Sequence, residues 1–254
     1  MTVSLRPDGT ALFEGLPEGF AAGFTTRRIH PDGRESREGE RHLARALGTR
    51  DATVVRIRQV HGAVVLVADG SCSGARHVGL GEADGIATRE SGLVLAVSTA
   101  DCVPLVLLDE ASGWIAAIQA GWRGTAARIV DAALDLLAAG GAPPEALRAY
   151  VGPSISRDRY EEGPEVVEAV RGAVPGGGDP PAAVRPGRDD RSWLDVAAFV
   201  RASLERRGVA GERIVDPGLC TAGDPALFPS YRRDGRGTGR ILTGIVRLPR
   251  RGPA

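Results

Sequence analysis

Residues 92–124 read GLVLAVSTADCVPLVLLDEASGWIAAIQAGWRG and contain three runs of almost uninterrupted apolar sequence. The runs are residues 92–98, 103–108 and 114–119. Apolar runs of this length are typical of central strands that are buried on both faces. The polar break Thr99-Ala100-Asp101-Cys102 separates the first two runs and predicts the turn of a buried hairpin. Three core strands are therefore expected here, with polar side chains at their ends.

Further strands and helices are predicted on either side of this stretch. Residues 53–60 and 63–68 are β-branched and partly alternating, which predicts two strands joined by a short turn at His61-Gly62. Thr125 can cap a helix that continues to Ala139, where Gly140-Gly141 ends it. The remaining predicted elements are strands at 147–151, 212–215 and 240–247 and helices at 164–173 and 194–207.

The order of these elements indicates the fold class. Strands and helices are mixed without a regular β-α-β alternation, so we expect an α+β fold in which helices cover a mixed β-sheet sandwich. A length of 254 residues fits one large domain or two small ones, and we assign residues 1–254 to a single domain. Residues 174–188 are rich in Gly and Pro, which predicts a mobile surface loop.

Charge and composition exclude several kinds of chemistry. The chain has 32 basic and 32 acidic residues and no basic stripe that could neutralise phosphates. We therefore expect a small-molecule substrate and no nucleic-acid partner. The chain contains no Lys, which excludes Schiff-base chemistry and a lysine general base. It also contains no Asn, which excludes N-glycosylation.

The cysteines and the apolar runs indicate the compartment. Cys72, Cys102 and Cys220 are widely spaced and form neither a CxxC pair nor a zinc-finger pattern. Free thiols in a reducing compartment are the simplest explanation. The first residues lack the apolar core of a signal peptide, and no apolar run has the length of a transmembrane helix. We expect a cytoplasmic protein with no membrane partner.

Polar residues interrupt or end the apolar strands at His61, Asp101-Cys102, Gln119 and Arg232-Arg233-Asp234. Burying such groups without a partner is costly, so each one requires an explanation. A thiol beside a carboxylate, with an imidazole available, suits zinc binding. It also suits a nucleophilic thiolate, formed when His61 takes the proton of Cys102. A buried structural cysteine and a turn histidine explain the same residues without chemistry.

Short motifs occur along the chain in a fixed order: QVHG (59–62), ADG (83–85), TADCVP (99–104), QAGWRG (119–124), GPSI (152–155), CT (220–221), SYRRD (230–234) and TGR (238–240). They resemble the signatures of the laccase-domain family over roughly residues 20–248. Members of that family are often named polyphenol oxidases and are associated with purine nucleoside phosphorylase and adenosine deaminase activities. The resemblance implies α/β/β/α layers and a monomer.

The resemblance also implies a metal site. In the family, the His of QVHG, the Cys of TADC and the His of HAGWRG hold zinc, which places ligands at His61, Cys102 and position 119. Gln119 is a departure, because an amide oxygen is a poorer zinc ligand than imidazole. A weakened zinc site is implied, with Asp101 as a further candidate at the catalytic centre. A metal-free Cys102–His61 dyad and a degenerate binding site remain as alternatives.

Other residues are candidates for substrate binding. With zinc present, the family chemistry would be attack by phosphate or water on a nucleoside, which gives phosphorolysis or deamination. Arg28, Arg123 and Arg233 are candidates for holding the anion, because a guanidinium matches phosphate oxygens. Surface solubility explains each of them as well. Tyr231 or Phe228 could stack on a nucleobase, although core packing explains both.

Two further segments bear on the site. Residues 29–45 lack the Asn-containing stretches usual in the family, which leaves His30 and His42 as candidates to compensate or implies a different substrate. Asp84, beside Gly85, is predicted to bond backbone groups near the site, although a turn residue needs no catalytic role.

The leading hypothesis is an enzyme acting on a purine nucleoside or related small molecule at His61 and Cys102, with Gln119 as an altered third ligand. The alternatives are a metal-independent cysteine hydrolase, a repurposed biosynthetic enzyme, and an inert binding protein. A copper laccase has the least support. Blue-copper sites use two histidines, a cysteine and an axial ligand, and the chain has four His in all.

Overall fold

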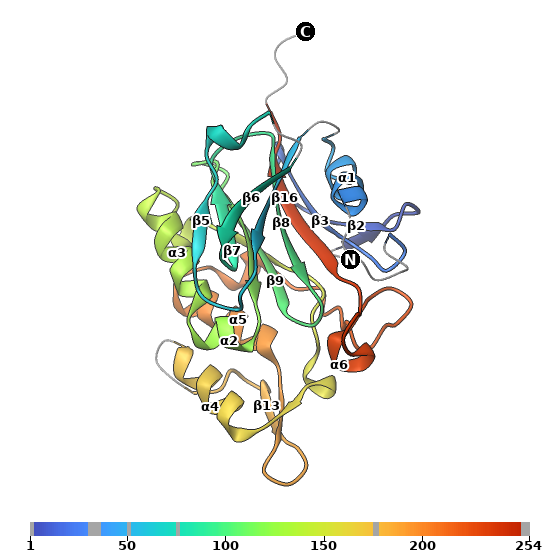
Figure 1. Cartoon of the computed structure of the whole chain (residues 1–254). Coiled ribbons are helices and arrows are strands. Elements are labelled where there is room, and N and C mark those ends of the chain that lie inside the picture. The colour runs from blue at the N-terminus through green and yellow to red at the C-terminus, as the bar shows by residue number, and fades with distance from the viewer. Residues whose placement is uncertain (1–2, 30–36, 50–51, 75–76, 175–177, 250–254) are drawn as a thin grey trace.

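The computed structural model describes residues 3–29, 37–49, 52–74, 77–174 and 178–249. Within these residues the strands form three sheets, of seven, six and three strands. Two large sheets form the centre of the molecule, with helix α1 on one side and helices α2, α3 and α5 on the other (Figure 1). This arrangement is the α/β/β/α layering that the resemblance implies.

The first large sheet has the strand order β1-β2-β3-β16-β8-β4-β6. Strand β4 runs parallel to β6 and β8, and the other neighbouring pairs are antiparallel. The sheet is therefore mixed, as expected. Its strands are β1 Val3–Leu5, β2 Thr10–Phe13, β3 Phe20–Thr25, β4 Thr53–Arg58, β6 His77–Glu82, β8 Leu93–Thr99 and β16 Ile241–Arg247.

The second large sheet has the order β15-β11-β9-β10-β7-β5, with parallel pairs at both edges and antiparallel pairs between them. Its strands are β5 Val65–Val67, β7 Gly85–Thr88, β9 Val103–Leu108, β10 Ile115–Ala120, β11 Arg148–Val151 and β15 Ile214–Val215. The small third sheet has the order β12-β14-β13, with β12 Glu161–Glu162, β13 Val184–Pro186 and β14 Ser192–Leu194.

The described part of the chain contains six α-helices: α1 Arg37–Ala46, α2 Trp122–Ala126, α3 Ile129–Ala139, α4 Pro164–Ala173, α5 Val196–Arg206 and α6 Tyr231–Asp234. Helix α1 packs on β2, β3 and β16 of the first sheet, whereas α3 packs on β10, β7 and β5 of the second. Helices α4 and α5 pack on α2. No described helix is both long enough and apolar enough to cross a membrane.

The central strands bury both faces, which explains their uninterrupted apolar sequence. In β8, Leu95 and Val97 belong to the core between the sheets, while Val94 and Ala96 belong to the core beneath α1. Strands β9 and β10 alternate in the same way between the inter-sheet core and the core beneath the helices. A two-residue period with apolar side chains at every position is the pattern expected for a strand covered on both sides.

The hairpin predicted around Thr99-Ala100-Asp101-Cys102 is wrong. Strands β4 and β5 lie in different large sheets, and so do β8 and β9. The polar segments that follow β4 and β8 carry the chain from one sheet to the other instead of reversing it within one sheet. Apolar runs that are buried on both faces cannot indicate which of these two courses the chain takes.

The predicted helix at 125–139 is two helices. Helix α2 already starts at Trp122, so Thr125 lies inside it and does not cap it. Arg128 then adopts a left-handed conformation with φ of 64° and separates α2 from α3. Because a left-handed residue cannot continue a right-handed helix, the chain turns there.

The remaining predicted elements occur close to their expected places. Strands β11 and β16 and helices α4 and α5 lie within a few residues of the predicted ranges, and the segment at 212–215 forms a short 3-10 turn followed by β15. The Gly/Pro-rich segment at 174–188 contains β13, and its residues 175–177 lie outside the described residues. Strands β1, β2 and β3 and helix α1 were not predicted.

Candidate functional site

A cavity of about 590 Å³ lies where β4, β8 and β10 end and where β9 and β16 begin. The motifs at 59–62, 99–104 and 119–124 all contribute to it. Its lining consists of Arg56, Ile57, Gln59, His61, Ser98, Ala100, Asp101, Cys102, Gln119, Ala120, Gly121, Trp122, Arg123, Ile155, Tyr160, Glu162, Val196, Tyr231, Arg232 and Arg240. The structure thus brings His61, Asp101, Cys102 and Gln119 together, although 58 residues separate the first from the last.

A buried carboxylate fixes the loop that carries His61. Asp84 is fully buried, and its carboxylate accepts hydrogen bonds from the backbone N–H groups of Val60 (3.2 Å), His61 (2.9 Å) and Gly62 (2.6 Å). His61 itself has a left-handed backbone with φ of 62°. This conformation is costly for a residue other than Gly, and the three bonds to Asp84 offset that cost. The predicted role of Asp84 beside the site is confirmed.

Cys102 and His61 both approach the backbone of Gly121. A Cβ atom at Gly121 would lie 2.7 Å from the Cys102 Sγ and 3.5 Å from the His61 Cδ2. Only glycine leaves room for the thiol, since real Cβ contacts are not as short as 2.7 Å. Burial, together with the neighbouring Asp101 charge, raises the pKa of the Cys102 thiol to about 12. The free thiol is therefore neutral at physiological pH.

The carboxylate of Asp101 is hydrogen-bonded to two other segments of the chain. One oxygen accepts a hydrogen bond from the Thr221 hydroxyl at 2.5 Å, and the other accepts from the backbone N–H of Arg232 at 2.7 Å. Its own backbone is left-handed, with φ of 84°. Asp101 therefore ties the β8–β9 connection to the segments at 221 and 232.

Gln119, at the end of β10, is bonded to the same carboxylate as the His61 loop. Its side-chain Nε2 donates to Asp84 Oδ1 at 2.9 Å, and its backbone N–H donates to the Asp84 carbonyl oxygen at 2.7 Å. The residue is only 4% exposed and lines the cavity. Among the described residues, no group donates a hydrogen bond to its side-chain oxygen.

The donors at the site do not fit a three-ligand metal centre. His61 and Cys102 converge, but Gln119 offers only an amide oxygen, and Asp101 is engaged elsewhere. Over the described ranges, no three His, Cys, Asp or Glu side chains are placed to hold a metal ion. Catalytic zinc sites have three protein ligands of these types, so the residues present fall one ligand short.

Four arginines line the cavity, and Arg123 is the one that was predicted. Its guanidinium lies 4.3 Å from the centre of the Trp122 ring. Arg240 donates to the backbone oxygens of Thr238 and Gly239, and its positive charge, like that of Arg123, counteracts the rise in the Cys102 pKa. Two positive charges therefore lie near enough to act on the thiol.

The other two arginines are held by acidic side chains. Arg232 lies 4.7 Å from the centre of the Tyr160 ring and forms an ion pair with Glu162. Arg56, on β4, is paired with Glu40 of α1 at 3.5 Å, and both side chains are almost buried. These fixed guanidinium groups can hold an anionic group only where their remaining N–H groups face the cavity.

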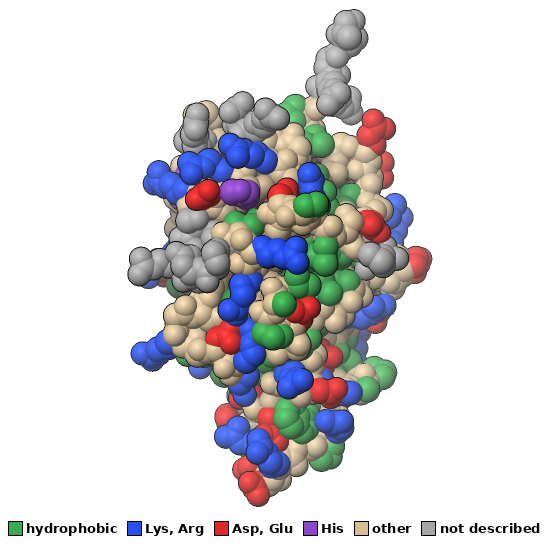
Figure 2. All heavy atoms as spheres, turned by 90° about the vertical axis from the view of Figure 1, so that its right-hand side faces the viewer, with side chains coloured by type: hydrophobic (Ala, Val, Ile, Leu, Met, Phe, Trp, Pro, Cys, Tyr) green, Lys and Arg blue, Asp and Glu red, His purple; other side chains and the backbone are tan. Residues whose placement is uncertain are grey.

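Arg28 and Arg233 do not line the cavity. Arg28 is exposed on the segment after β3. Arg233 is bonded to its neighbour Asp234 and to the backbone oxygens of Thr221 and Phe228, so its fork is used within the protein. Figure 2 shows the side of the molecule that includes α1 and α6, where arginine side chains gather with acidic and apolar side chains between them.

Of the two aromatic candidates for stacking on a nucleobase, only Tyr231 lies at the cavity. Tyr231 is 50% exposed and lines the cavity, whereas Phe228 is buried in the core between the sheets. Tyr160 also lines the cavity and was not predicted. Burial raises its pKa, and so does the nearby negative charge of Glu162.

The remaining histidines and cysteines lie elsewhere. His42 is on α1, where its ring contacts the backbone oxygen of Glu38, and it does not line the cavity; His30 lies outside the described residues. Cys72 is buried in the core between the sheets. Cys220 accepts a hydrogen bond from the Ser156 hydroxyl at 3.0 Å.

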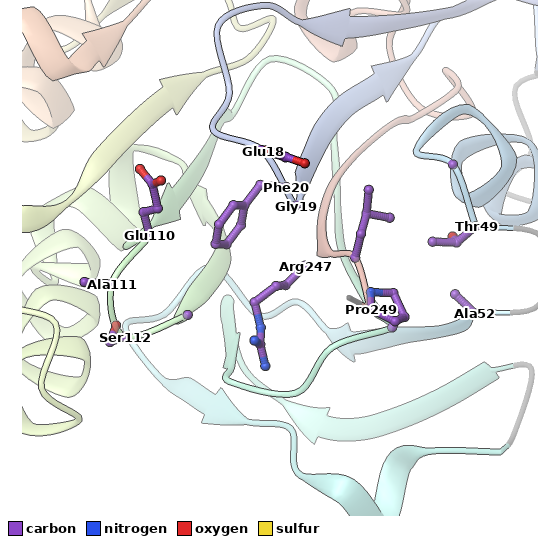
Figure 3. A pocket seen from close by; sticks show the side chains of 14 residues that line it. Glu18, Gly19, Phe20, Thr49, Ala52, Glu110, Ala111, Ser112, Arg247 and Pro249 are labelled. Atoms are coloured by element: carbon purple, nitrogen blue, oxygen red, sulfur yellow. The ribbon is translucent and has the colours of Figure 1, made fainter. Parts of the chain in front are cut away.

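A larger hollow of about 1200 Å³ lies at the other ends of the strands, where β3 and β8 begin and β16 ends. Phe20, Glu110 and Arg247 lie around it (Figure 3). None of the motif residues lies there. Size alone therefore does not identify the functional cavity, and the convergence of His61 and Cys102 favours the smaller one.

Comparison with known proteins identifies the family. Residues 23–248 match the family described as multi-copper polyphenol oxidoreductase laccase. The chain belongs to this laccase family. It is 38% identical to a purine nucleoside phosphorylase of Deinococcus radiodurans over 93% of the chain and 87% of that protein. It is 43% identical to a purine nucleoside phosphorylase of Streptomyces coelicolor over 81% of the chain and 79% of that protein.

Other relatives extend the comparison. The laccase-family chain is 37% identical to adenosine deaminase RL5, from an unknown prokaryotic organism, over 81% of the chain and 79% of that protein. The crystal structure of YlmD from Geobacillus stearothermophilus superimposes with a TM-score of 0.87 at 28% identity, covering 98% of the chain and 99% of YlmD. The fold class predicted from the sequence is confirmed.

Sequence reasoning missed several residues of the cavity in this family member. Arg240 lies in the TGR motif and Arg232 in SYRRD, so both were within recognised segments, but neither was selected as a candidate for holding the anion. Arg56 and Tyr160 carried no motif signal. Arg56 is paired with Glu40 of α1, and Tyr160 packs against the guanidinium of Arg232. Both are contacts between separate segments of the chain that no motif indicates.

Proposed function

We propose that the chain is an enzyme acting on purine nucleosides and that its reaction is phosphorolysis. The observation that carries the proposal is the cavity itself: His61 and Cys102 meet at one wall, arginines surround them, and aromatic side chains form another part of the lining. A volume of about 590 Å³ lies within the range of small-molecule sites. The relatives named purine nucleoside phosphorylase support the same substrate class.

The proposed reaction forms one bond and breaks one bond. A phosphate oxygen bonds to C1′ of the ribose while the bond from C1′ to N9 of the purine breaks, and the purine leaves with the electron pair. Arg123 and Arg240 would hold the phosphate, because their charges already act on the thiol at this wall. His61 would supply a proton to the leaving purine, which no longer has to depart as an anion.

Cys102 enters this proposal as a neutral thiol beside the reacting groups. Its raised pKa disfavours the thiolate that a metal-independent cysteine hydrolase would require. Deamination, the activity named for one relative, is the second candidate, because water could occupy the same wall in place of phosphate. Neither reaction is proposed to use a metal ion, because the described residues supply no third ligand beside His61 and Cys102.

The test is to incubate the purified chain with inosine, guanosine or adenosine, with and without inorganic phosphate. Chromatography measures the free base and ribose 1-phosphate, and an ammonia assay measures deamination. We expect free base only when phosphate is present. His61→Ala should lower the rate by about 100-fold or more, the usual effect of losing a general acid.

Matched variants make the test specific to the cavity. His42→Ala removes an exposed imidazole on α1, and Cys72→Ala removes a thiol in the core between the sheets. Neither change should alter the catalytic constant of the folded protein, whereas Cys102→Ala should lower it. Release of ammonia without free base would establish deamination instead. No reaction with any nucleoside would refute the proposal.

A further inference from the structure

The orientation of the Gln119 amide is determined by its neighbour. Four N–H groups point at the carboxylate of Asp84: three from the backbone at Val60, His61 and Gly62, and one from the side chain of Gln119. An ionised carboxylate only accepts hydrogen bonds. A reversed amide would place the Gln119 oxygen against a carboxylate oxygen, which is repulsive. The nitrogen of Gln119 is therefore held at Asp84.

The other end of the same amide is consequently fixed as well. With the nitrogen at Asp84, the oxygen of Gln119 has no donor within the residues that the structure describes, and the side chain lines the cavity. Gln59, in the same cavity, differs in this respect. Its nitrogen donates to the Ser98 carbonyl at 2.9 Å and its oxygen accepts from the Ser98 N–H at 2.8 Å, so both ends are satisfied by the protein.

We propose that Gln119 is a specificity-determining residue whose fixed oxygen accepts a hydrogen bond from the bound nucleoside and does not coordinate a metal ion. The proposal rests on the proposed function for the identity of the ligand. The complementary group is an N–H or O–H donor of that nucleoside: the 6-amino group of the base, or the 2′- or 3′-hydroxyl of the ribose. A ligand without this donor would leave a buried acceptor unpaired, which costs free energy.

The test measures binding of adenosine and of three analogues by calorimetry in the absence of phosphate. Purine riboside lacks the 6-amino group, and 2′-deoxyadenosine and 3′-deoxyadenosine each lack one hydroxyl. We expect one analogue to bind the wild-type protein about tenfold or more weakly than adenosine does, as for loss of one hydrogen bond to a buried group. The analogue that loses affinity identifies the donor.

Two variants assign that preference to position 119. In Gln119→Met the weakened analogue should bind within about twofold of adenosine, because the acceptor is gone. In Gln59→Met the tenfold ratio should persist, since both ends of that amide already pair with Ser98. Persistence of the ratio in Gln119→Met would overturn the proposal. Equal binding of all four compounds by the wild-type protein would also overturn the proposal, and this measurement does not depend on any variant folding.

Titration with Zn²⁺ alone supplies a second readout. We expect the wild-type protein and Gln119→Met to have the same zinc affinity within about twofold and Gln119→His to bind at least about tenfold more tightly, since imidazole is the better ligand. A tenfold loss in Gln119→Met would show that the amide oxygen coordinates the metal, against the proposal. No gain in Gln119→His would show that position 119 does not face the point where His61 and Cys102 meet, which also overturns it.

The two proposals fail in different ways. If adenosine binds but the analogue panel is flat, only the role of Gln119 is refuted. If no nucleoside binds the wild-type protein, the proposed function is refuted, and the assignment of a nucleoside donor falls with it.

Discussion

Replacing Asp84 with asparagine tests whether one buried carboxylate organises the site. The substitution keeps the size of the side chain but exchanges one carboxylate oxygen for an NH₂ group. Oδ1 accepts from the His61 backbone N–H and from the Gln119 side chain, and Oδ2 accepts from the backbone N–H groups of Val60 and Gly62. Whichever oxygen is replaced, two N–H donors then face another donor.

The expected loss of stability follows from these contacts. A hydrogen bond to a charged group contributes about 1.5–3 kcal/mol, so two lost bonds amount to roughly 3–6 kcal/mol. If Gln119 turns its amide to pair with the new NH₂ group, one bond is recovered, and the loss falls to roughly 1.5–3 kcal/mol. Either value is a large part of the stability of an ordinary domain, about 5–15 kcal/mol.

Chemical denaturation of Asp84→Asn and the wild-type protein measures the difference. Asp109→Asn is a matched control, because Asp109 is also buried and accepts from the backbone N–H groups of Ala111 and Ser112, far from the cavity. Both variants should lose stability, but only Asp84→Asn should alter ligand binding, since His61 and Gln119 depend on it. A change of less than about 0.5 kcal/mol, the usual effect of a neutral surface substitution, would refute the reasoning.

Three further perturbations are predicted. Gly121→Ala places a methyl group 2.7 Å from the Cys102 sulfur, so denaturation should show a loss of about 1–3 kcal/mol, and near-wild-type stability would contradict the geometry. Glu40→Gln removes the charge paired with the nearly buried Arg56 and should cost about 1–3 kcal/mol, whereas Glu205→Gln, in an exposed pair, should cost under about 1 kcal/mol. Burial raises the pKa of Cys102 from 9.0 to about 12, so the folded protein keeps this proton while the unfolded chain loses it. The free energy of unfolding should therefore fall as the pH rises above about 9, and it should fall less in Cys102→Ala. A rate of Cys102 alkylation that already reaches its plateau below pH 9 would contradict this.

The elements that could be predicted from the sequence are those with a clear local signal. Helix α4 occupies the predicted range, residues 164–173, because a glycine and a proline begin it and its apolar residues repeat at helical spacing. The apolar runs correctly indicated β8, β9 and β10. The pairing of these strands could not be predicted, because it depends on which sheet each short polar connection reaches.

The residues of the candidate site could likewise be predicted only in part. The motifs placed His61, Cys102 and Gln119 in one cavity, and the structure agrees. They could not distinguish Arg232 from Arg233. Neighbouring residues on a helix point about 100° apart, so only the position of α6 decides that Arg232 faces the cavity while Arg233 turns toward Asp234.

The pairing of Gln119 with Asp84 explains how this position can change its chemistry without disturbing the fold. The fully buried carboxylate of Asp84 accepts an N–H from position 119. A histidine, the residue usual in the family here, could give one ring N–H to that carboxylate and offer its second nitrogen to a cation. Glutamine keeps the donor but presents a carbonyl oxygen to the cavity in place of that nitrogen. The structural requirement is met in both cases, so selection on the group facing the ligand can act independently of folding.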